Sequence, residues 1–218
     1  MKTFFFDSIH NTQEYALSKI NEESVLVVSY SQEVGKGTSN KVWKNADQSL
    51  ACSLAIREQD IKLLPTLISL ASSYDFLKTI KNPHVYLKWP NDIMKNQKKV
   101  GGVLVEKVGE NICIGMGINY FWKDPEILNA GALYDKLQNF DLINQHAISW
   151  ATNFEKTLTQ GRFSLDEYKE NLKTLGKVVE YPEGRGWAMN VNSDGSLLVK
   201  TIEGTLINLT SPLISEVN

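Results

Sequence analysis

Lys88-Trp89-Pro90-Asn91-Asp92 comes a short lysine-containing turn before Lys99-Val100-Gly101-Gly102-Val103-Leu104-Val105-Glu106. An apolar segment runs into the Pro-Asn-Asp break, turns between Ile93 and Lys98, and returns as a second apolar segment. This order predicts a β-hairpin with strands over residues 85–89 and 101–108 and polar groups at its mouth. Paired glycines beside a charged residue indicate that a ligand comes close to the backbone here.

The composition is that of a globular enzyme. The chain has 218 residues, 42% of them hydrophobic, which is enough for one domain with a real core and a small second unit. Its net charge of -2 predicts no general binding of DNA. The chain has no apolar run long enough to span a membrane, and Asp7 comes too early for a signal peptide, so we expect a cytoplasmic protein.

Cysteine and histidine spacing gives no sign of a metal site. Cys52 and Cys113 each lie in an apolar segment without a CxxC partner, which predicts buried, reduced thiols. His10, His84 and His146 are scattered and lack the HExxH spacing of zinc sites. We therefore predict no metal ligands from these residue types.

The rest of the chain alternates strand and helix patterns up to about residue 175 and then changes to short strands. Strands are predicted over residues 4–6, 24–30, 49–56 and 111–119, and helices over 11–19, 64–77, 146–158 and 164–175, whereas 124–145 has no regular pattern. Further strands are predicted over 177–181, 187–191, 196–200 and 204–209. The pattern predicts an α+β fold, in which a mixed or antiparallel sheet backed by helices forms residues 1–175 and a small β-barrel or sandwich forms residues 176–218.

The predicted strand over 111–119 differs strongly between its two faces. Isoleucine and methionine alternate with Cys113, Gly115, Gly117 and Asn119, so one face is apolar and the other is nearly bare backbone. Such a bare face can form a floor for a flat ligand, although tight helix packing would use the same glycines. The polar Asn119 at the end of the row favours the ligand interpretation.

Several lysines accompany these glycines. Lys36 and Lys41 lie on a glycine-containing loop, and Lys99 lies beside the paired glycines, an arrangement suited to two anionic groups. Each lysine taken alone is typical of a solvated surface. Asp92 is compatible with a metal ligand or with its own turn, and Trp43 with base stacking or with core packing.

Generic nucleotide and hydrolase motifs are absent. Tyr30 stands where a Walker A loop needs its first glycine, and Asn40 replaces the third glycine of a GxGxxG fingerprint. No GxSxG segment occurs either, so a serine hydrolase has little support.

Three segments together resemble the successive core motifs of biotin protein ligases, in family order and at family-like spacing. They are Lys88 to Asp92, Lys99 to Glu106, and Gly115-Met116-Gly117-Ile118-Asn119. Residues 32–43 resemble the glycine- and arginine-rich adenylate-binding loop of that family, residues 9–16 resemble its early Asp-Ser-Thr-Asn segment, and residues 177–217 are similar to its SH3-like C-terminal domain. The resemblance covers nearly the whole chain and implies a class II synthetase-like catalytic domain.

The resemblance also implies a reaction. Biotin and MgATP would form biotinoyl-AMP, which would then acylate one lysine of a biotin carboxyl carrier domain. The implied cofactors are ATP and Mg²⁺. No helix-turn-helix pattern precedes Phe4, so we expect a ligase without a repressor module and without DNA as a partner. Monomer and homodimer both stay open.

Site residues follow from the matched motifs. Lys36 and Lys99 would be the catalytic cations that bridge a carboxylate and a phosphate, which otherwise repel each other. The implied binding residues are Thr12, Gln13, Gln32, Gly35, Gly37, Thr38, Lys41, Trp43, Lys88, Trp89, Asn91, Asp92, Gly101, Gly102, Gly115, Gly117 and Asn119.

The chain departs from the family pattern in its loop, where Lys36, Thr38 and Lys41 stand in place of several arginines. Lysine keeps the charge but lacks the bidentate fork of arginine, so we expect biotinoyl-AMP to be held loosely. Two other functions compete with this hypothesis. One is a lipoate or octanoate ligase or transferase of the same superfamily, and the other is a non-catalytic module that binds biotin or a nucleotide.

Overall fold

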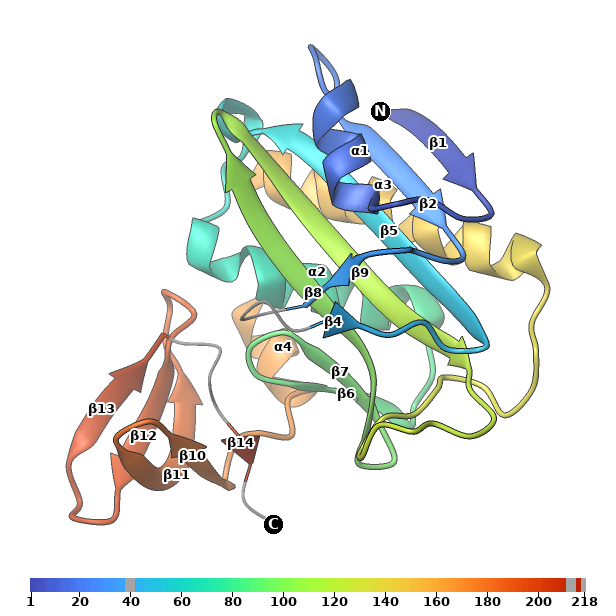
Figure 1. The fold of residues 1–218 in the computed structure, drawn as a ribbon. Helices are drawn as coiled ribbons and strands as arrows, with labels where there is room; N and C mark the ends of the chain where they lie inside the picture. The colour runs from blue at the N-terminus through green and yellow to red at the C-terminus, as the bar shows by residue number, and fades with distance from the viewer. Residues whose placement is uncertain (38–41, 211–214, 217–218) are drawn as a thin grey trace.

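The fold is built on a seven-stranded sheet with the order β1-β2-β5-β9-β8-β7-β6 (Figure 1). The computed structural model describes residues 1–37, 42–210 and 215–216. β1 pairs with β2 in parallel, and the other neighbours in the sheet are antiparallel, so the mixed sheet predicted from the sequence is confirmed. The strands are β1 (Lys2–Phe6), β2 (Val25–Ser29), β5 (Gln48–Arg57), β6 (Val85–Lys88), β7 (Asp92–Lys95), β8 (Lys98–Val108) and β9 (Asn111–Phe121).

Two long helices cover one face of this sheet (Figure 1). They are α2 (Ile68–Ile80) and α3 (Phe140–Gln160), and a short 3-10 turn over Pro65–Leu67 precedes α2. Trp150 of α3 is fully buried, stacks on Phe154 at 5.6 Å between ring centres, and donates its indole N–H to the Ser72 carbonyl. This satisfied indole fastens α3 to α2 above the sheet. No helix among the described residues is long and apolar enough to cross a membrane.

The opposite face carries a short helix, α1 (Thr12–Lys19), near its β1 end (Figure 1). Asn11 caps this helix, since its side-chain oxygen accepts from the backbone N–H groups of Gln13 and Glu14. A full capping box would also need the Glu14 carboxylate to accept from the Asn11 backbone N–H. The Glu14 carboxylate does not return to the cap but pairs with Lys36.

The predicted hairpin is wrong in one respect, because a third strand lies between its two arms. β6 pairs with β7, and β7 pairs with β8, so the segment forms a meander with two tight turns. The first turn contains the cis Trp89–Pro90 bond, and the second has positive φ at Asn96 and Gln97. Residues 92–95 were missed because the Pro-Asn-Asp break looked like the whole turn.

The later helices also differ from the prediction. α3 begins at Phe140, with Asn139 as its cap, instead of at residue 146. Polar residues in its first two turns hide the helical period. α4 (Leu165–Glu170) is capped by Ser164 and ends five residues before residue 175, the predicted end of this helix. Cys52 and Cys113 are free and buried, as the sequence predicted.

A second, smaller sheet follows α4. Its strands are β10 (Val178–Tyr181), β11 (Gly184–Val191), β12 (Leu197–Thr201), β13 (Leu206–Leu209) and β14 (Ser215–Glu216). They pair antiparallel in the order β13-β12-β11-β10-β14, and no β13–β14 pairing closes a barrel in the described part of the chain. Figure 1 shows this sheet beside the end of the larger domain that holds β6 and β7.

Candidate active site

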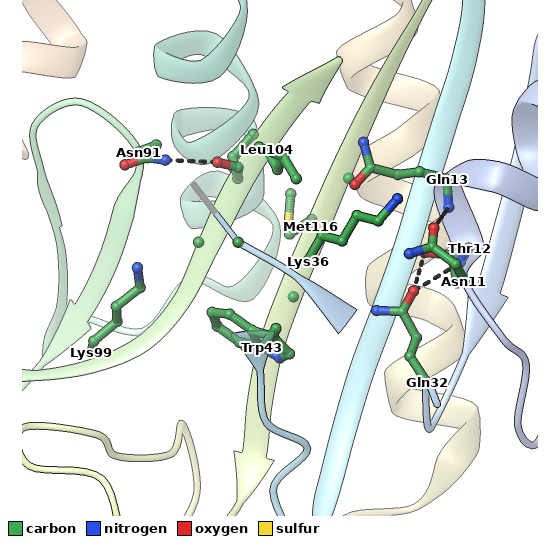
Figure 2. A pocket seen from close by; sticks show the side chains of 15 residues that line it. Asn11, Thr12, Gln13, Gln32, Lys36, Trp43, Asn91, Lys99, Leu104 and Met116 are labelled. Carbon is green, nitrogen blue, oxygen red and sulfur yellow. Dashed lines mark hydrogen bonds between the residues drawn. The ribbon is translucent and has the colours of Figure 1, made fainter. Parts of the chain in front are cut away.

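A narrow cavity lies on the face of the large sheet that α2 and α3 leave uncovered. We call it the inner cavity; its volume is about 40 Å³, and it is bounded by α1, by β8 and β9, and by the short ribbon of β3 (Gly35–Lys36) and β4 (Val42–Trp43). Its lining residues are Asn11, Thr12, Gln13, Gln32, Lys36, Gly37, Trp43, Asn91, Lys99, Gly102, Val103, Leu104, Gly115, Met116 and Gly117 (Figure 2). Segments far apart in sequence therefore meet here, as the motifs led us to expect.

One end of the inner cavity is a fixed polar network. The Gln32 side-chain oxygen accepts from both the backbone N–H and the hydroxyl of Thr12, at 2.8 and 2.9 Å. Ser53 on β5 in turn donates to the Thr12 hydroxyl at 2.8 Å. Because each member is held by the next, this end of the site is preorganised.

Gln13 supplies an unpaired donor to the same end. Gln13 is 6% exposed, and its side-chain Nε2 is buried without a partner among the residues that the structure describes. A buried amide without a partner costs about 1–3 kcal/mol, so such groups commonly mark a place where a ligand supplies the missing partner. Figure 2 places Gln13 beside Asn11 and across the cavity from Lys99.

The glycines of β9 clear the floor. A Cβ atom at Gly115 would lie 2.5 Å from the Gln13 amide oxygen, and one at Gly117 would lie 2.8 Å from the Trp43 indole. Both distances are shorter than real Cβ contacts, so these positions must lack a side chain for Gln13 and Trp43 to occupy the site. Gly117 therefore makes room for Trp43 in the cavity, whereas Gly115 makes room for Gln13 and so serves both the cavity and the packing of α1 on β9.

A β-bulge points Lys99 at the site. Gly101 lies opposite Ile93, but Lys99 lies opposite Met94, which leaves Val100 as an extra residue on β8. Without the bulge, alternation would put Lys99 on the same face as Gly101, toward the core. Instead its ammonium lies 3.3 Å from where a Gly102 Cβ would stand and 5.8 Å from the Trp43 ring centre.

Both candidate cations already have carboxylate partners. Lys99 forms an ion pair with Asp92 of the neighbouring strand, and Lys36 pairs with Glu14 of α1 at 2.7 Å. The hydrogen bond between Lys36 and Glu14 raises the pKa of Lys36 and lowers the pKa of Glu14. The two lysines lie on opposite sides of Trp43 in Figure 2.

A wider cavity adjoins the first. This outer cavity has a volume of about 370 Å³ and shares Gly37, Trp43 and Lys99 with the inner one. Asn119 lines it, and its side-chain oxygen is buried without a partner in the described part of the chain, while its amide nitrogen donates to the Gly131 carbonyl at 2.9 Å. A volume of this size falls in the usual range for small-molecule sites, about 300–1,000 Å³.

The other predicted residues divide between the cavity walls and the surrounding structure. Lys88 and Asp92 line the outer cavity, and Asn91 lines the inner one, where its amide donates to the Val103 carbonyl at 2.8 Å. Gly101 faces the core, where a Cβ would lie 2.4 Å from Ile118. Gly35 lies against Trp43 in the β3–β4 ribbon.

Trp89 lies away from both cavities. It is 3% exposed and donates its indole N–H to the carbonyl of Gly195, in the turn between β11 and β12, at 2.9 Å. Its role is thus to join the two sheets. Thr38 and Lys41 lie outside the described residues.

Sequence reasoning missed the apolar residues of the outer cavity other than Trp43, and it missed the partner of Lys36. Trp122, Ile127 and Leu128 line the outer cavity, and Leu128 is 88% exposed. Apolar side chains in a stretch without helix or strand period were the available signal, because such residues have no core to enter. Glu14 gave no signal in the sequence beyond its place three residues after Asn11.

Comparison with known proteins gives the family of the chain. The family described as Biotin/lipoate A/B protein ligase matches residues 5–119, which include every described residue of the inner cavity. The bifunctional ligase/repressor BirA of Bacillus subtilis is 30% identical over 92% of this chain and 70% of its own length. The chain belongs to the biotin/lipoate A/B protein ligase family.

Solved structures show the same fold over nearly the whole chain. A biotin protein ligase from Aquifex aeolicus in complex with biotin and ATP has a TM-score of 0.79 and 21% identity, covering 99% of this chain and 98% of that one. The biotin acetyl coenzyme A carboxylase synthetase from Helicobacter pylori with bound biotinylated ATP has a TM-score of 0.73 and 25% identity, covering 95% and 99%. Both similarities extend into the second sheet, which the family match does not reach.

Proposed function

We propose that this family member is an ATP-dependent biotin protein ligase. One observation carries the proposal: Lys36 and Lys99, from separate segments, line one cavity whose floor is kept bare by Gly115 and Gly117. Two cations beside adjoining cavities suit a reaction in which a carboxylate must approach a polyphosphate. The names of the relatives, among them the biotin–[acetyl-CoA-carboxylase] ligase of Paracoccus denitrificans, support biotin over lipoate.

The inner cavity would hold biotin. The ureido group of biotin needs hydrogen-bond donors for its carbonyl and acceptors for its N–H groups. Gln13 Nε2 is a buried donor without a partner among the described residues. The network of Thr12, Gln32 and Ser53 surrounds the same end. At about 40 Å³ the cavity is much smaller than a biotin site, so Lys36 and Trp43 must move when biotin enters.

In the first step an oxygen of the biotin carboxylate attacks the α-phosphorus of ATP. The new bond is a carboxylic–phosphoric anhydride, and the bond to the bridging oxygen breaks, so pyrophosphate leaves with the electron pair. Lys99 stands where the two cavities meet and would neutralise the negative charge that gathers as they approach. Lys36 would break its ion pair with Glu14 and act as the second of the two bridging cations.

In the second step a neutral lysine amine of a carrier domain attacks the carbonyl carbon of the anhydride. An amide forms, AMP leaves, and the amine loses a proton. Trp43 covers the meeting point of the cavities and would keep water from competing with the amine.

Mg²⁺ would enter with ATP. No group of three or more His, Cys, Asp or Glu side chains lies together in the described residues, but Mg²⁺ bound with a nucleotide needs only one or two carboxylates besides phosphate and water. Asp92, 21% exposed at the outer cavity, is a suitable one. When bound, the ion supplies positive charge to the phosphates.

A biotin-dependent exchange of labelled pyrophosphate into ATP tests the first step without any carrier. We expect exchange with biotin and none with lipoate or octanoate. Exchange supported by lipoate alone would assign the chain to the other branch of the family. Tight biotin binding with no exchange would favour a binding module.

The remaining predictions stay proposals. The carrier would be a biotin carboxyl carrier domain of a carboxylase, and an avidin blot after incubation with biotin and MgATP would detect its labelling. The cytoplasmic location, the choice between monomer and homodimer, and the division at residues 175 and 176 still rest on the sequence alone.

A further inference from the structure

A basic groove lies at the outer edge of the large sheet, beyond the outer cavity. Its volume is about 510 Å³, and its lining includes Lys88, Lys173, Lys177 and His84. No carboxylate lines it within the described residues. In a chain with a net charge of -2, a wall with three lysines and no acid differs from an ordinary mixed surface.

The groove is built by backbone pairing. β6 is the edge strand of the sheet, and Tyr86 and Lys88 point to the same side of it because they are two residues apart. The chain after α4 runs along this edge, since the N–H of Lys173 donates to the Leu87 carbonyl at 3.0 Å. This pairing brings the Lys173 ammonium to 4.3 Å from the Tyr86 ring centre.

The basic groove opens onto the reaction site. Lys88, Met94 and Asn129 line both the groove and the outer cavity. Lys88 also lies opposite Asp92 across the β6–β7 pair, and Asp92 is the partner of Lys99. A chain segment bound in the groove would therefore lie within a few side-chain lengths of Lys99.

The charge of the groove restricts what can bind there. The acceptor of the second step is a lysine, which is a cation at neutral pH and is repelled by three other lysines. Carboxylates beside that lysine would reverse the repulsion. Once docked, the nearby cations would lower the pKa of the acceptor amine and favour the neutral form that attacks.

We propose that the basic groove binds an acidic surface of the protein that presents the acceptor lysine. The proposal rests on the ligase function given above. Pyrophosphate is a different candidate occupant. The groove is larger than one pyrophosphate needs, and its lysines come from two segments along a sheet edge, which fits an extended partner better than a compact anion.

Lys173→Glu tests the proposal, with Lys156→Glu as the matched control. Both lysines are exposed, but Lys156 lies on α3, which covers one face of the sheet, whereas the groove lies at the edge formed by β6. Two rates are measured: biotin-dependent pyrophosphate exchange, which needs no acceptor, and biotin transfer to a purified biotin carboxyl carrier domain. Normal exchange by Lys173→Glu also shows that the variant is folded.

We expect Lys173→Glu to keep its exchange rate within about twofold and to raise the KM for the carrier domain about tenfold, as expected for reversal of one interface charge. Lys173→Gln should give an intermediate KM, and Lys156→Glu an unchanged one. Added salt should raise the KM of the wild-type protein more than that of Lys173→Glu.

Three results would overturn the proposal. An unchanged carrier KM in Lys173→Glu removes the groove as the docking surface. A raised KM for pyrophosphate in the exchange reaction, with normal carrier KM, assigns the groove to pyrophosphate. Absence of exchange by the wild-type protein refutes the ligase function itself, and the docking proposal falls with it.

Discussion

On β9, Ile114 and Ile118 belong to the same core as α2 and α3 and are fully buried, whereas Gly115 and Gly117 on the opposite face border the inner cavity. The two sets alternate along one strand, so they share the same backbone and the same neighbouring strands. What separates them is side-chain volume. One face is filled to hold the sheet to its helices, and the other is emptied so that Gln13, Trp43 and a ligand have room.

Substitutions on the filled face should therefore lower the stability of the protein, whereas substitutions on the open face should lower its activity. Ile118→Ala on the filled face removes buried methyl groups and should lower the free energy of unfolding by about 2–5 kcal/mol. Chemical denaturation followed by circular dichroism measures this loss. A loss below about 1 kcal/mol would mean that this face is not a close-packed core.

Lys99→Ala on the open face should have the largest effect on activity. Removing one preorganised charge from a reacting centre typically slows turnover about 10²–10³-fold. Biotin-dependent pyrophosphate exchange reports the rate, and biotin affinity measured by calorimetry serves as the control. Unchanged exchange would remove Lys99 from the first step, whereas loss of biotin binding would make it a binding residue.

Gly117→Ala places one methyl group next to Ile118 but on the other face. Its backbone φ is not in the left-handed region, so we expect the free energy of unfolding to stay within about 1 kcal/mol. The methyl group would displace the Trp43 indole, and the KM for ATP should rise about tenfold. A stability loss as large as that of Ile118→Ala would contradict the distinction between the faces.

Glu14→Gln tests whether the Glu14 carboxylate competes with the anionic ligand for Lys36. The substitution frees Lys36 without changing the size of the side chain, so the anionic adenylate should dissociate about two- to fivefold more slowly. Stopped-flow dissociation of biotinoyl-AMP measures the rate, with Glu33→Gln as a nearby control. Equal rates in both variants would show that the Glu14 pair does not compete with the ligand.

The smallest effect concerns acid stability on the covered side. Burial lowers the pKa of His146, which lies 2.7 Å from the hydroxyl of the buried Tyr120. Because the unfolded chain binds a proton there more readily, stability should be full above the ordinary histidine pKa of about 6.5 and fall as the pH drops below it. His146→Gln should flatten this part of the curve of Tm against pH; an unchanged slope would assign the dependence to other groups.

Sequence predicted the filled face better than the open one. Period-two alternation identified β9 and its two faces, because burial and strand geometry act on neighbouring residues. It did not predict the direction of Lys99, since the extra residue Val100 is visible only in the register with β7. Nor did it find Glu14 or Leu128 as site residues, because their partners are distant in the chain and the segment around Leu128 has no period.

The Trp89 bond to Gly195 has a further consequence for unfolding. Val179, Ala188 and Val199 of the small sheet belong to the same hydrophobic cluster as the core of the large one, so no solvent layer separates them. Releasing the small sheet would expose this cluster and leave the buried Trp89 N–H without its acceptor. We therefore expect heat to melt both sheets in one cooperative transition, in which strands β10 to β13 are a structural part of the fold that carries the site.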